Sequence, residues 1–212
     1  MKALTRPTPA PPHLSNFTGG LHHWSQVTLL YVWPSIQQMQ AGFCAYCECS
    51  LDDKKHVEHF RPRKHFPKLT FRWDNLFGSC CGTQRCGTFK DNGAGQYNPD
   101  ELIKPDVDDP DDYLLFLTTG KVIPAQDLEE RDLRKAEETI RVFNLNNDPA
   151  LFGRRRTALS LELENVQELH DAKNYFSEEE WLELLKPEIE RACQMEFSTA
   201  LKHAWRFNIK YE

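Results

Sequence analysis

Cys44-Ala45-Tyr46-Cys47 and a second group, Cys80-Cys81 with Cys86, frame the stretch of sequence that decides the fold. A Cys-x2-Cys pair holds two thiolates close enough for one tetrahedral ion, and a second cysteine group further along the chain can complete the coordination shell. We therefore expect a structural zinc ion bound by Cys44, Cys47, Cys80 and Cys86. Because Cys81 is adjacent to Cys80, it remains the alternative ligand at that position.

The number and placement of the cysteines favour metal binding over disulfide bonds. The chain has seven cysteines, an odd number, and all but Cys193 lie between Cys44 and Cys86. The N-terminal residues lack the apolar segment of a secretion signal, and no run of about 18 apolar residues could form a transmembrane helix. These features predict a cytoplasmic protein with reduced thiols. Cys193 stands on a helical pattern and is expected to be a buried small apolar residue.

Between the two cysteine groups, Glu58 and His59 are adjacent in the sequence. Adjacent side chains on a strand point to opposite faces, so these two can act at one site only where the strand ends or bends. Pro62 favours such a bend. His56 has the same strand parity as Glu58, so those two side chains can face one ion.

This combination of motifs resembles the HNH endonucleases. The shared features are the Cys-x2-Cys pair, Glu58-His59-Phe60-x-Pro62, Trp73-x-Asn75-Leu76 and a final cysteine group followed by Lys90. The fuller run, from Cys44 through Glu48 to Arg85-Cys86-Gly87-x-x-Lys90, is similar to the PtuB-type nucleases of Septu and retron-linked anti-phage systems. That similarity extends through Leu145-Asn146.

The resemblance implies a role for each matching residue. The histidine of the acid–histidine pair is the general base that activates water, which here is His59. The preceding acid, Glu58, would ligate Mg²⁺ or Mn²⁺, and Asn75 would brace the loop that carries the histidine. An imidazole with an ordinary pKa of about 6.5 suits proton transfer near neutral pH, and a divalent ion stabilises charge on the phosphate. Two kinds of ion are thus expected, a structural zinc and a catalytic Mg²⁺ or Mn²⁺.

One position departs from the family pattern. The family commonly has His or Asn directly after the last cysteine, whereas this chain has Gly87, which cannot bind an ion. The missing ligand must then come from elsewhere. We expect it to be Asp91, Asn92 or His56, in that order.

Positive charge is concentrated near these motifs. The whole chain carries a formal net charge of −6, yet residues 54–90 contain nine Lys or Arg against two acidic residues. Phosphates would dock where positive charge gathers. The residues predicted to bind nucleic acid are Arg61, Arg63, Lys64, Lys68, Arg85 and Lys90.

The chain as a whole predicts an α+β fold. Its centre is a zinc-stabilised ββα-metal core, similar to a treble clef, with a β-hairpin, an N-terminal helix and C-terminal helices around it. We expect a Pro-rich surface arm at residues 1–20 and the nuclease core at residues 21–125. Residues 126–212 form a helical region that packs on the core or on a partner.

Local patterns give the expected elements. We use proline positions, turn signals and the periodicity of apolar residues. A capping box at Ser177 and Glu180 and five aspartates between residues 106 and 112 add to these signals. The predictions are a helix at 23–40 kinked or split at Pro34, a turn at 51–55, a strand at 56–60, a helix or turn at 72–77, an irregular segment at 78–87, a solvated loop at 106–112, a hairpin at 113–123, and helices at 133–143, at 151–173 and from 177 onward with a division at Pro187.

The predicted function is metal-dependent hydrolysis of phosphodiester bonds in nucleic acid. DNA is the expected substrate, and RNA such as tRNA stays open. The alternative is a zinc-stabilised nucleic-acid-binding module with a degenerate nuclease site, which Gly87 favours. The resemblance also implies partners: an ATPase of the PtuA type and, in some systems, a retron reverse transcriptase with its RNA–DNA product.

Overall fold

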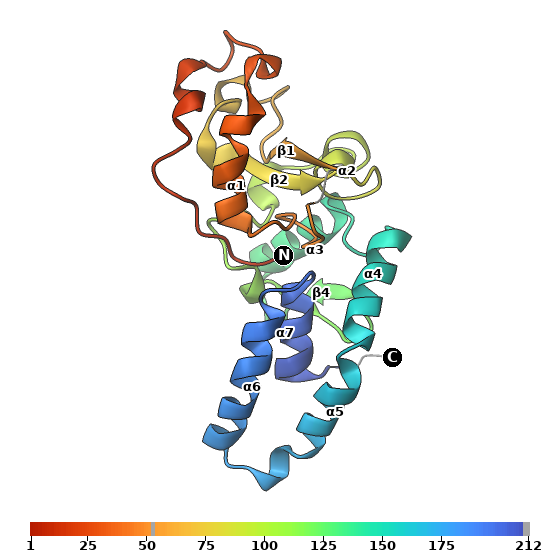
Figure 1. Cartoon of the computed structure of the whole chain (residues 1–212). Coiled ribbons are helices and arrows are strands. Elements are labelled where there is room, and N and C mark those ends of the chain that lie inside the picture. The colour runs from red at the N-terminus through yellow and green to blue at the C-terminus, as the bar shows by residue number, and fades with distance from the viewer. Residues whose placement is uncertain (52–53, 210–212) are drawn as a thin grey trace.

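The computed structural model describes residues 1–51 and 54–209. Its helices and strands are α1 (Trp33–Gln40), β1 (Lys55–His59), β2 (Leu76–Cys80), α2 (Cys86–Asn92), β3 (Leu114–Phe116), β4 (Val122–Pro124), α3 (Glu130–Val142), α4 (Pro149–Ser160), α5 (Leu163–Asp171), α6 (Glu178–Ala192) and α7 (Ser198–Phe207). Short 3₁₀ turns are η1 (Pro12–Asn16), η2 (Trp24–Gln26), η3 (Leu29–Tyr31), η4 (Pro67–Leu69), η5 (Trp73–Asn75), η6 (Pro99–Glu101), η7 (Pro110–Asp112) and η8 (Lys173–Tyr175). The predicted α+β class is confirmed. β1, β2 and α1 lie toward one end of the molecule, and α5 and α6 lie toward the other (Figure 1).

β1 and β2 pair antiparallel, with His59 opposite Leu76 and Lys55 opposite Cys80. The predicted strand at 56–60 corresponds to β1, which pairs with β2. Asp52 and Asp53 of the predicted turn at 51–55 lie outside the described residues. β2 was missed because all five of its residues are buried, so its sequence shows no alternation of polar and apolar side chains. Gly78 is required in β2, since a Cβ there would lie only 2.8 Å from Ile36 Cγ2.

α1 is shorter than the predicted helix at residues 23–40. Pro34 stands in its first turn, where the missing N–H costs nothing, so the proline begins the helix instead of kinking it. The residues before it form the separate turns η2 and η3. Ile36 and Met39 are buried where α1 lies against β2 (Figure 1).

The N-terminal arm at residues 1–20 packs on the chain's own core, a contact that the prediction of a surface arm did not include. The Arg6 guanidinium stacks on the rings of Trp73 and Phe77, 4.7 and 4.6 Å from the ring centroids. It also donates to the Leu76 carbonyl oxygen and pairs with Asp106. A buried arginine with this many partners fixes the arm over the start of β2.

The acidic segment at residues 106–112 is held by ion pairs and is not the predicted solvated loop. Asp106 binds Arg6 and Lys104, Asp108 binds Lys135, and Asp111 binds Lys202 and His203. The predicted hairpin follows it as β3 and β4, with Leu115 opposite Ile123. These three of the five aspartates tie the segment to different parts of the chain, and Asp109 and Asp112 are exposed.

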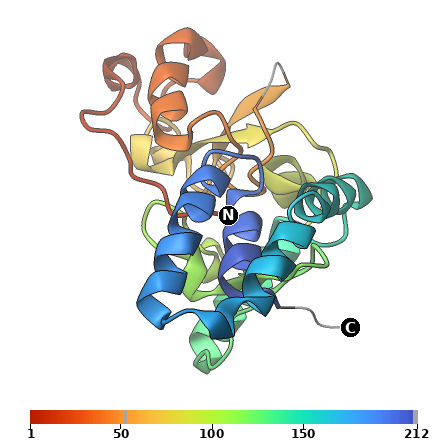
Figure 2. The same ribbon diagram turned by 60° about the horizontal axis from the view of Figure 1, so that its bottom comes forward.

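Four helices, α4 to α7, form the C-terminal part and come forward in Figure 2. The predicted helix at 151–173 is divided into α4 and α5, while the capping box at Ser177 and Glu180 begins α6 as predicted. α6 continues through Pro187 because this proline is exposed, so the carbonyl that loses its partner can reach water. Every helix in residues 1–51 and 54–209 is too short or too polar to cross a lipid bilayer.

The Asp111 cluster predicts an acid-dependent stability. Burial alone would raise the pKa of Asp111, but hydrogen bonds from His203 and Lys202 outweigh burial and hold that pKa well below its usual range. The stabilisation is therefore complete above the unfolded-state pKa of about 3.9 and is lost as the pH falls through the lower folded-state value. Asp111→Asn should cost about 1–3 kcal/mol of unfolding free energy at pH 7.

Thermal unfolding of Asp111→Asn and the unsubstituted chain between pH 7 and pH 2 measures this effect. The difference in Tm should stay constant down to about pH 5 and shrink in more acidic buffer. Asp112→Asn is the matched control, because its side chain is exposed on the same turn. A Tm difference independent of pH would refute the assignment.

Candidate functional site

Four cysteines meet at one buried point between α1, β2 and α2. Cys44 and Cys47 come from the turn after α1, Cys80 ends β2 and Cys86 begins α2; we call these four the cysteine quartet. Their sulfur atoms all lie within 4.8 Å of one another, and Cys47 Sγ and Cys80 Sγ are 3.8 Å apart. Zn–S bonds of about 2.3 Å in a tetrahedron put sulfur atoms about 3.8 Å apart. The quartet can therefore hold a metal ion such as zinc, and Cys80, not Cys81, is the member from that pair.

The electrostatics of the quartet also suit a cation. Burial raises the pKa of the Cys44 and Cys86 thiols, so thiolates there require compensating positive charge. Arg85 contributes part of it: hydrogen bonding and charge couple it to Cys80, and Nη1 lies 3.0 Å from Asp148 Oδ2. Arg85 was predicted to bind nucleic acid. Its side chain is engaged by these partners, and nucleic-acid binding by Arg85 stays a prediction.

The remaining cysteines lie outside the quartet. Cys81 is exposed, with Sγ 3.5 Å from His56 Nδ1. Cys193 was predicted to be buried but is exposed at the end of α6. Its helical pattern was read correctly, but the helix ends at Ala192 and leaves the thiol in solvent.

Glu58 is buried among charged groups, and its main partner is a lysine. Lys90 Nζ lies 2.9 Å from Glu58 Oε1, and His56 Nε2 lies 3.4 Å from Oε2. Burial raises the pKa of Glu58, but the hydrogen bond with His56 and the charge of Lys90 outweigh it and lower the pKa overall. His56 and Glu58 thus share one face of β1. Lys90 was predicted to bind nucleic acid. Its side chain is only 1% exposed and is paired within this cluster, and nucleic-acid binding by Lys90 stays a prediction.

The residues predicted to replace the missing ligand lie in different places relative to Glu58. Asp91 Oδ1 lies 2.5 Å from Lys90 Nζ, so Asp91 joins the cluster. Asn92 is exposed and donates from Nδ2 to the Thr88 carbonyl oxygen, so it does not. Gly87 gives Glu58 its room, because a Cβ on Gly87 would lie 2.3 Å from Glu58 Oε2.

This cluster does not fit a hard divalent ion. Mg²⁺ takes about six oxygen ligands at about 2.1 Å, of which one or two are protein carboxylates free of other cations and several are waters. Here an ammonium lies against the Glu58 carboxylate and the third neighbour is an imidazole. Among residues 1–51 and 54–209, the cysteine quartet is the group of three or more His, Cys, Asp and Glu side chains whose ligand atoms are close enough for one ion. Of the residues predicted to bind Mg²⁺ or Mn²⁺, Glu58, His56 and Asp91 lie together around Lys90 and Asn92 lies apart; binding of a catalytic ion stays a prediction.

His59 lies at the end of β1 in a fixed orientation. Its Nε2 is 3.0 Å from the Thr70 carbonyl oxygen, which can only accept, so Nε2 carries the proton and Nδ1 the lone pair. Burial, and then the charge of Arg63, lowers the pKa of His59 to about 4, which keeps the ring neutral at pH 7. Trp24 covers the ring edge-on with 4.5 Å between centroids, and His59 is 5% exposed.

Asn75 holds the loop that follows His59. Its Oδ1 accepts from the Arg61 backbone N–H at 2.8 Å. Its Nδ2 donates to the carbonyl oxygens of Arg61 and Leu69 at 3.1 and 3.2 Å. These three bonds fix both ends of the loop that contains Pro62, and the bracing role of Asn75 in catalysis stays a prediction.

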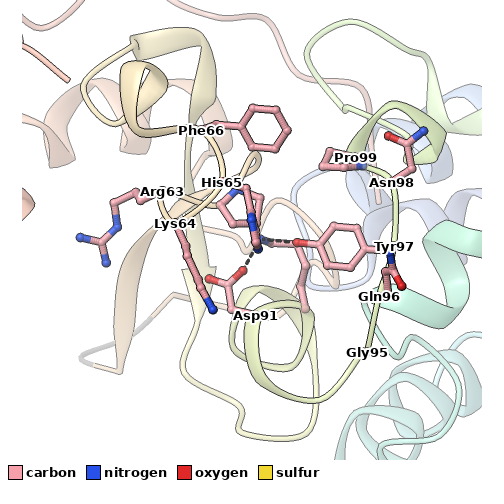
Figure 3. A pocket seen from close by; sticks show the side chains of 12 residues that line it. Arg63, Lys64, His65, Phe66, Asp91, Gly95, Gln96, Tyr97, Asn98 and Pro99 are labelled. Atoms are coloured by element: carbon pink, nitrogen blue, oxygen red, sulfur yellow. Dashed lines mark hydrogen bonds and ion pairs between the residues drawn. The ribbon is translucent and has the colours of Figure 1, made fainter. Parts of the chain in front are cut away.

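The loop at residues 61–68 borders a cavity of about 710 Å³. Arg63, Lys64 and Lys68 are exposed, whereas Arg61 pairs with Asp100. The rings of Phe66 and Tyr97 point into the cavity from opposite segments, and the Arg63 guanidinium points away from it (Figure 3). The other lining side chains include Asp91, Gln96 and Asn98, with Lys90 beneath them. Glu58 and His59 do not line this cavity, but the His59 carbonyl oxygen accepts from Lys90 Nζ at 3.2 Å.

Comparison with known proteins gives a consistent relationship. No family model matches the chain. The chain is 29% identical over 150 residues to the Septu protein PtuB of Bacillus thuringiensis, covering 69% of this chain and 53% of that protein. It is 29% identical over 162 residues to the Septu protein PtuB of Bacillus mycoides strain KBAB4, covering 62% and 52%. The chain is similar to the PtuB proteins. The predicted resemblance to PtuB is thereby confirmed, and the chain spans about half the length of these curated relatives.

Two residues of the site region, Trp24 and Tyr97, escaped prediction from the sequence, and the burial of a third, Lys90, was not predicted. Trp24 was read as one apolar position of a helix, and Tyr97 lies in a segment without any repeating pattern. Lys90 did carry a signal: it stands four residues after Cys86 in α2, so the two share the helix face that points inward. That spacing favours a buried lysine over a surface contact.

Proposed function

We propose that this chain is a nucleic-acid hydrolase of a Septu-type anti-phage defence system, as its similarity to PtuB supports. The reaction is hydrolysis of a phosphodiester bond. The quartet would hold zinc and fix the segment that carries His59, since β1, β2 and α2 all lie next to it. The HNH assignment of part of this chain remains our proposal and rests on the motifs and on the geometry around His59.

The observation that carries the proposal is the tautomer of His59. A proton on Nε2, bound to the Thr70 carbonyl oxygen, leaves Nδ1 as a base on a neutral ring. A water molecule that attacks phosphorus must lose a proton, and Nδ1 of His59 would take it. Asn75 fixes the loop beside this ring, so the base keeps one orientation.

Trp24 must move before a phosphate can reach His59. It covers the imidazole ring, and it also lies 5.9 Å from the ring of Phe71, between centroids. Because Trp24 belongs to the short turn η2 and not to a longer helix, its displacement leaves β1 and β2 intact. Substrate would then lie along the 61–68 loop, where exposed cations meet the phosphates.

The charges of that loop give a testable prediction. Replacing both Arg63 and Lys64 with glutamate should weaken nucleic-acid binding at least about tenfold at low salt, because two phosphate contacts are lost and two repulsive charges are added. The salt dependence of binding should also become less steep by about two phosphate contacts. Fluorescence anisotropy with labelled DNA and RNA at several salt concentrations measures both quantities.

Lys186→Glu is the matched control for this double variant. Lys186 is an exposed cation on α6, at the opposite end of the molecule from β1 (Figure 1). Its replacement changes the net charge but not the loop. Equal weakening by the control would show that net charge alone governs binding.

The partners are also a proposal. Similarity to PtuB supports association with an ATPase of the PtuA type. The resemblance of the sequence motifs to retron-linked systems extends the proposal to a retron reverse transcriptase. Leu182 and Leu184 on α6 are 54% and 42% exposed, whereas the N-terminal arm is packed on the core. These exposed leucines favour the C-terminal helices over the arm as the surface for a partner.

The direct test is cleavage of labelled DNA and RNA by the zinc-loaded chain, with and without a PtuA-type ATPase. Cleavage that requires His59 supports the hydrolase. The second candidate, a nucleic-acid-binding module with a degenerate nuclease site, is favoured by the Lys90–Glu58 pair. Binding without cleavage under every ionic and partner condition would establish that second function.

A further inference from the structure

Lys90 is a buried lysine whose ammonium is surrounded by oxygen atoms. Nζ donates to the His59 carbonyl oxygen at 3.2 Å, to Asp91 Oδ1 at 2.5 Å and to Tyr97 Oη at 3.2 Å. An ammonium has three hydrogens, so these three acceptors use all of them. The fourth neighbour is Glu58 Oε1 at 2.9 Å, an ion pair without an aligned hydrogen bond.

This arrangement has the form of a cation site. Two carboxylates, a phenol oxygen and a backbone carbonyl oxygen surround one positive charge, and the lysine side chain is fully buried. The positively charged residue, Lys90, belongs to α2, the helix that also supplies Cys86 to the quartet. Because α2 is fixed at Cys86, the lysine four residues later is aimed at the end of β1.

Gly87 explains why Glu58 can take part. A Cβ at this position would lie 2.3 Å from Glu58 Oε2 and 2.5 Å from Glu58 Cδ. The carboxylate therefore occupies the space that a longer side chain on residue 87 would fill. Gly87 and Lys90 therefore act together: the glycine leaves room for the Glu58 carboxylate, and the lysine from the next turn of α2 supplies the positive charge beside it.

We propose that the Lys90 ammonium is the resident cation of the Glu58 cluster, in the place where a divalent ion was expected. Glu58 then neutralises Lys90 and does not ligate Mg²⁺ or Mn²⁺. Lys90 also lies beneath the cavity next to the 61–68 loop, so its charge is fixed close to the proposed path of the phosphates. This consequence for cleavage rests on the proposed function, whereas the occupancy of the cluster does not.

The test is a titration of the zinc-loaded chain with Mn²⁺. Binding is measured as the decrease in the electron paramagnetic resonance signal of free Mn²⁺. The unsubstituted chain and Glu58→Gln should bind Mn²⁺ equally weakly. Lys90→Met should gain a saturable site of at least about tenfold higher affinity, because it leaves two carboxylates and a carbonyl oxygen without a cation. Adding Glu58→Gln to Lys90→Met should remove that site.

Lys64→Met is the matched control, since it removes an exposed positive charge from the border of the same cavity. One Mn²⁺ bound per unsubstituted chain and lost in Glu58→Gln would overturn the proposal. A folded Lys90→Met that gains no site would overturn it too. If Lys90→Met does not fold, the comparison of the unsubstituted chain with Glu58→Gln still decides the question. Failure of the cleavage assay would count against the hydrolase without changing these binding results.

Discussion

His59→Ala is expected to lower the rate of nucleic-acid cleavage by about 10²–10⁴-fold, the usual contribution of a positioned general base. The physical reason is the loss of the lone pair on Nδ1, which is presented because Nε2 is bound to the Thr70 carbonyl oxygen. Zinc content should not change, because His59 lies outside the quartet. Initial cleavage rates on labelled nucleic acid, together with zinc analysis of the same preparation, measure both expectations.

Two further variants make the result specific to the base. His59→Gln keeps most of the side-chain volume but offers no base, so it should be as inactive as His59→Ala. His170→Gln is the control, because His170 is a histidine on α5 that binds the Trp205 carbonyl oxygen and lies away from β1. Full cleavage activity in His59→Ala would exclude His59 as the general base and remove the main support for a hydrolase.

Cys80→Ser and Cys86→Ser are expected to lose zinc and with it the folded core. Changes to groups that only support metal ligands cost about 10–100-fold in affinity, so loss of a ligand should exceed about 100-fold. Structural zinc binding contributes directly to folding free energy. Because the quartet joins the turn after α1 to β2 and α2, its loss should abolish cooperative thermal unfolding of that part of the chain.

Cys81→Ser and Cys193→Ser provide the controls for the quartet. Both residues are exposed, and Cys81 is next to Cys80 in the sequence. Both variants should keep about one zinc per chain and an unchanged Tm. Metal analysis by mass spectrometry and circular dichroism melting curves report the two outcomes. Zinc retained in Cys80→Ser but lost in Cys81→Ser would reverse the assignment of ligands.

Several features of the fold and of the site were predicted from short stretches of sequence. The Cys-x2-Cys pair predicted the quartet, because a short spacing forces two thiolates together whatever surrounds them. Asn75 was expected beside the histidine loop and bonds both of its ends. The β3–β4 hairpin and the start of α6 were predicted by turn and capping signals, which depend on a few adjacent residues.

What failed depended on distant parts of the chain. β2 has no alternation because both of its faces are buried, so only its neighbours identify it as a strand. The segment at residues 106–112 was predicted to be solvated, but three of its aspartates form ion pairs with Arg6, Lys135 and Lys202, which are distant in the sequence or in other elements. The sequence also did not indicate that Arg85 and Lys90 form ion pairs with Asp148 and Glu58 inside the fold.

The sequence by itself determined the cysteine quartet, the acid–histidine strand and the similarity to PtuB, because each of these is recognised from short motifs whose residues lie a few positions apart. Tertiary structure alone decided which cation stands beside Glu58 and what covers His59. The reason is that Lys90 and Trp24 come from α2 and η2, and the spacing of residues along the chain does not show that these elements pack against β1.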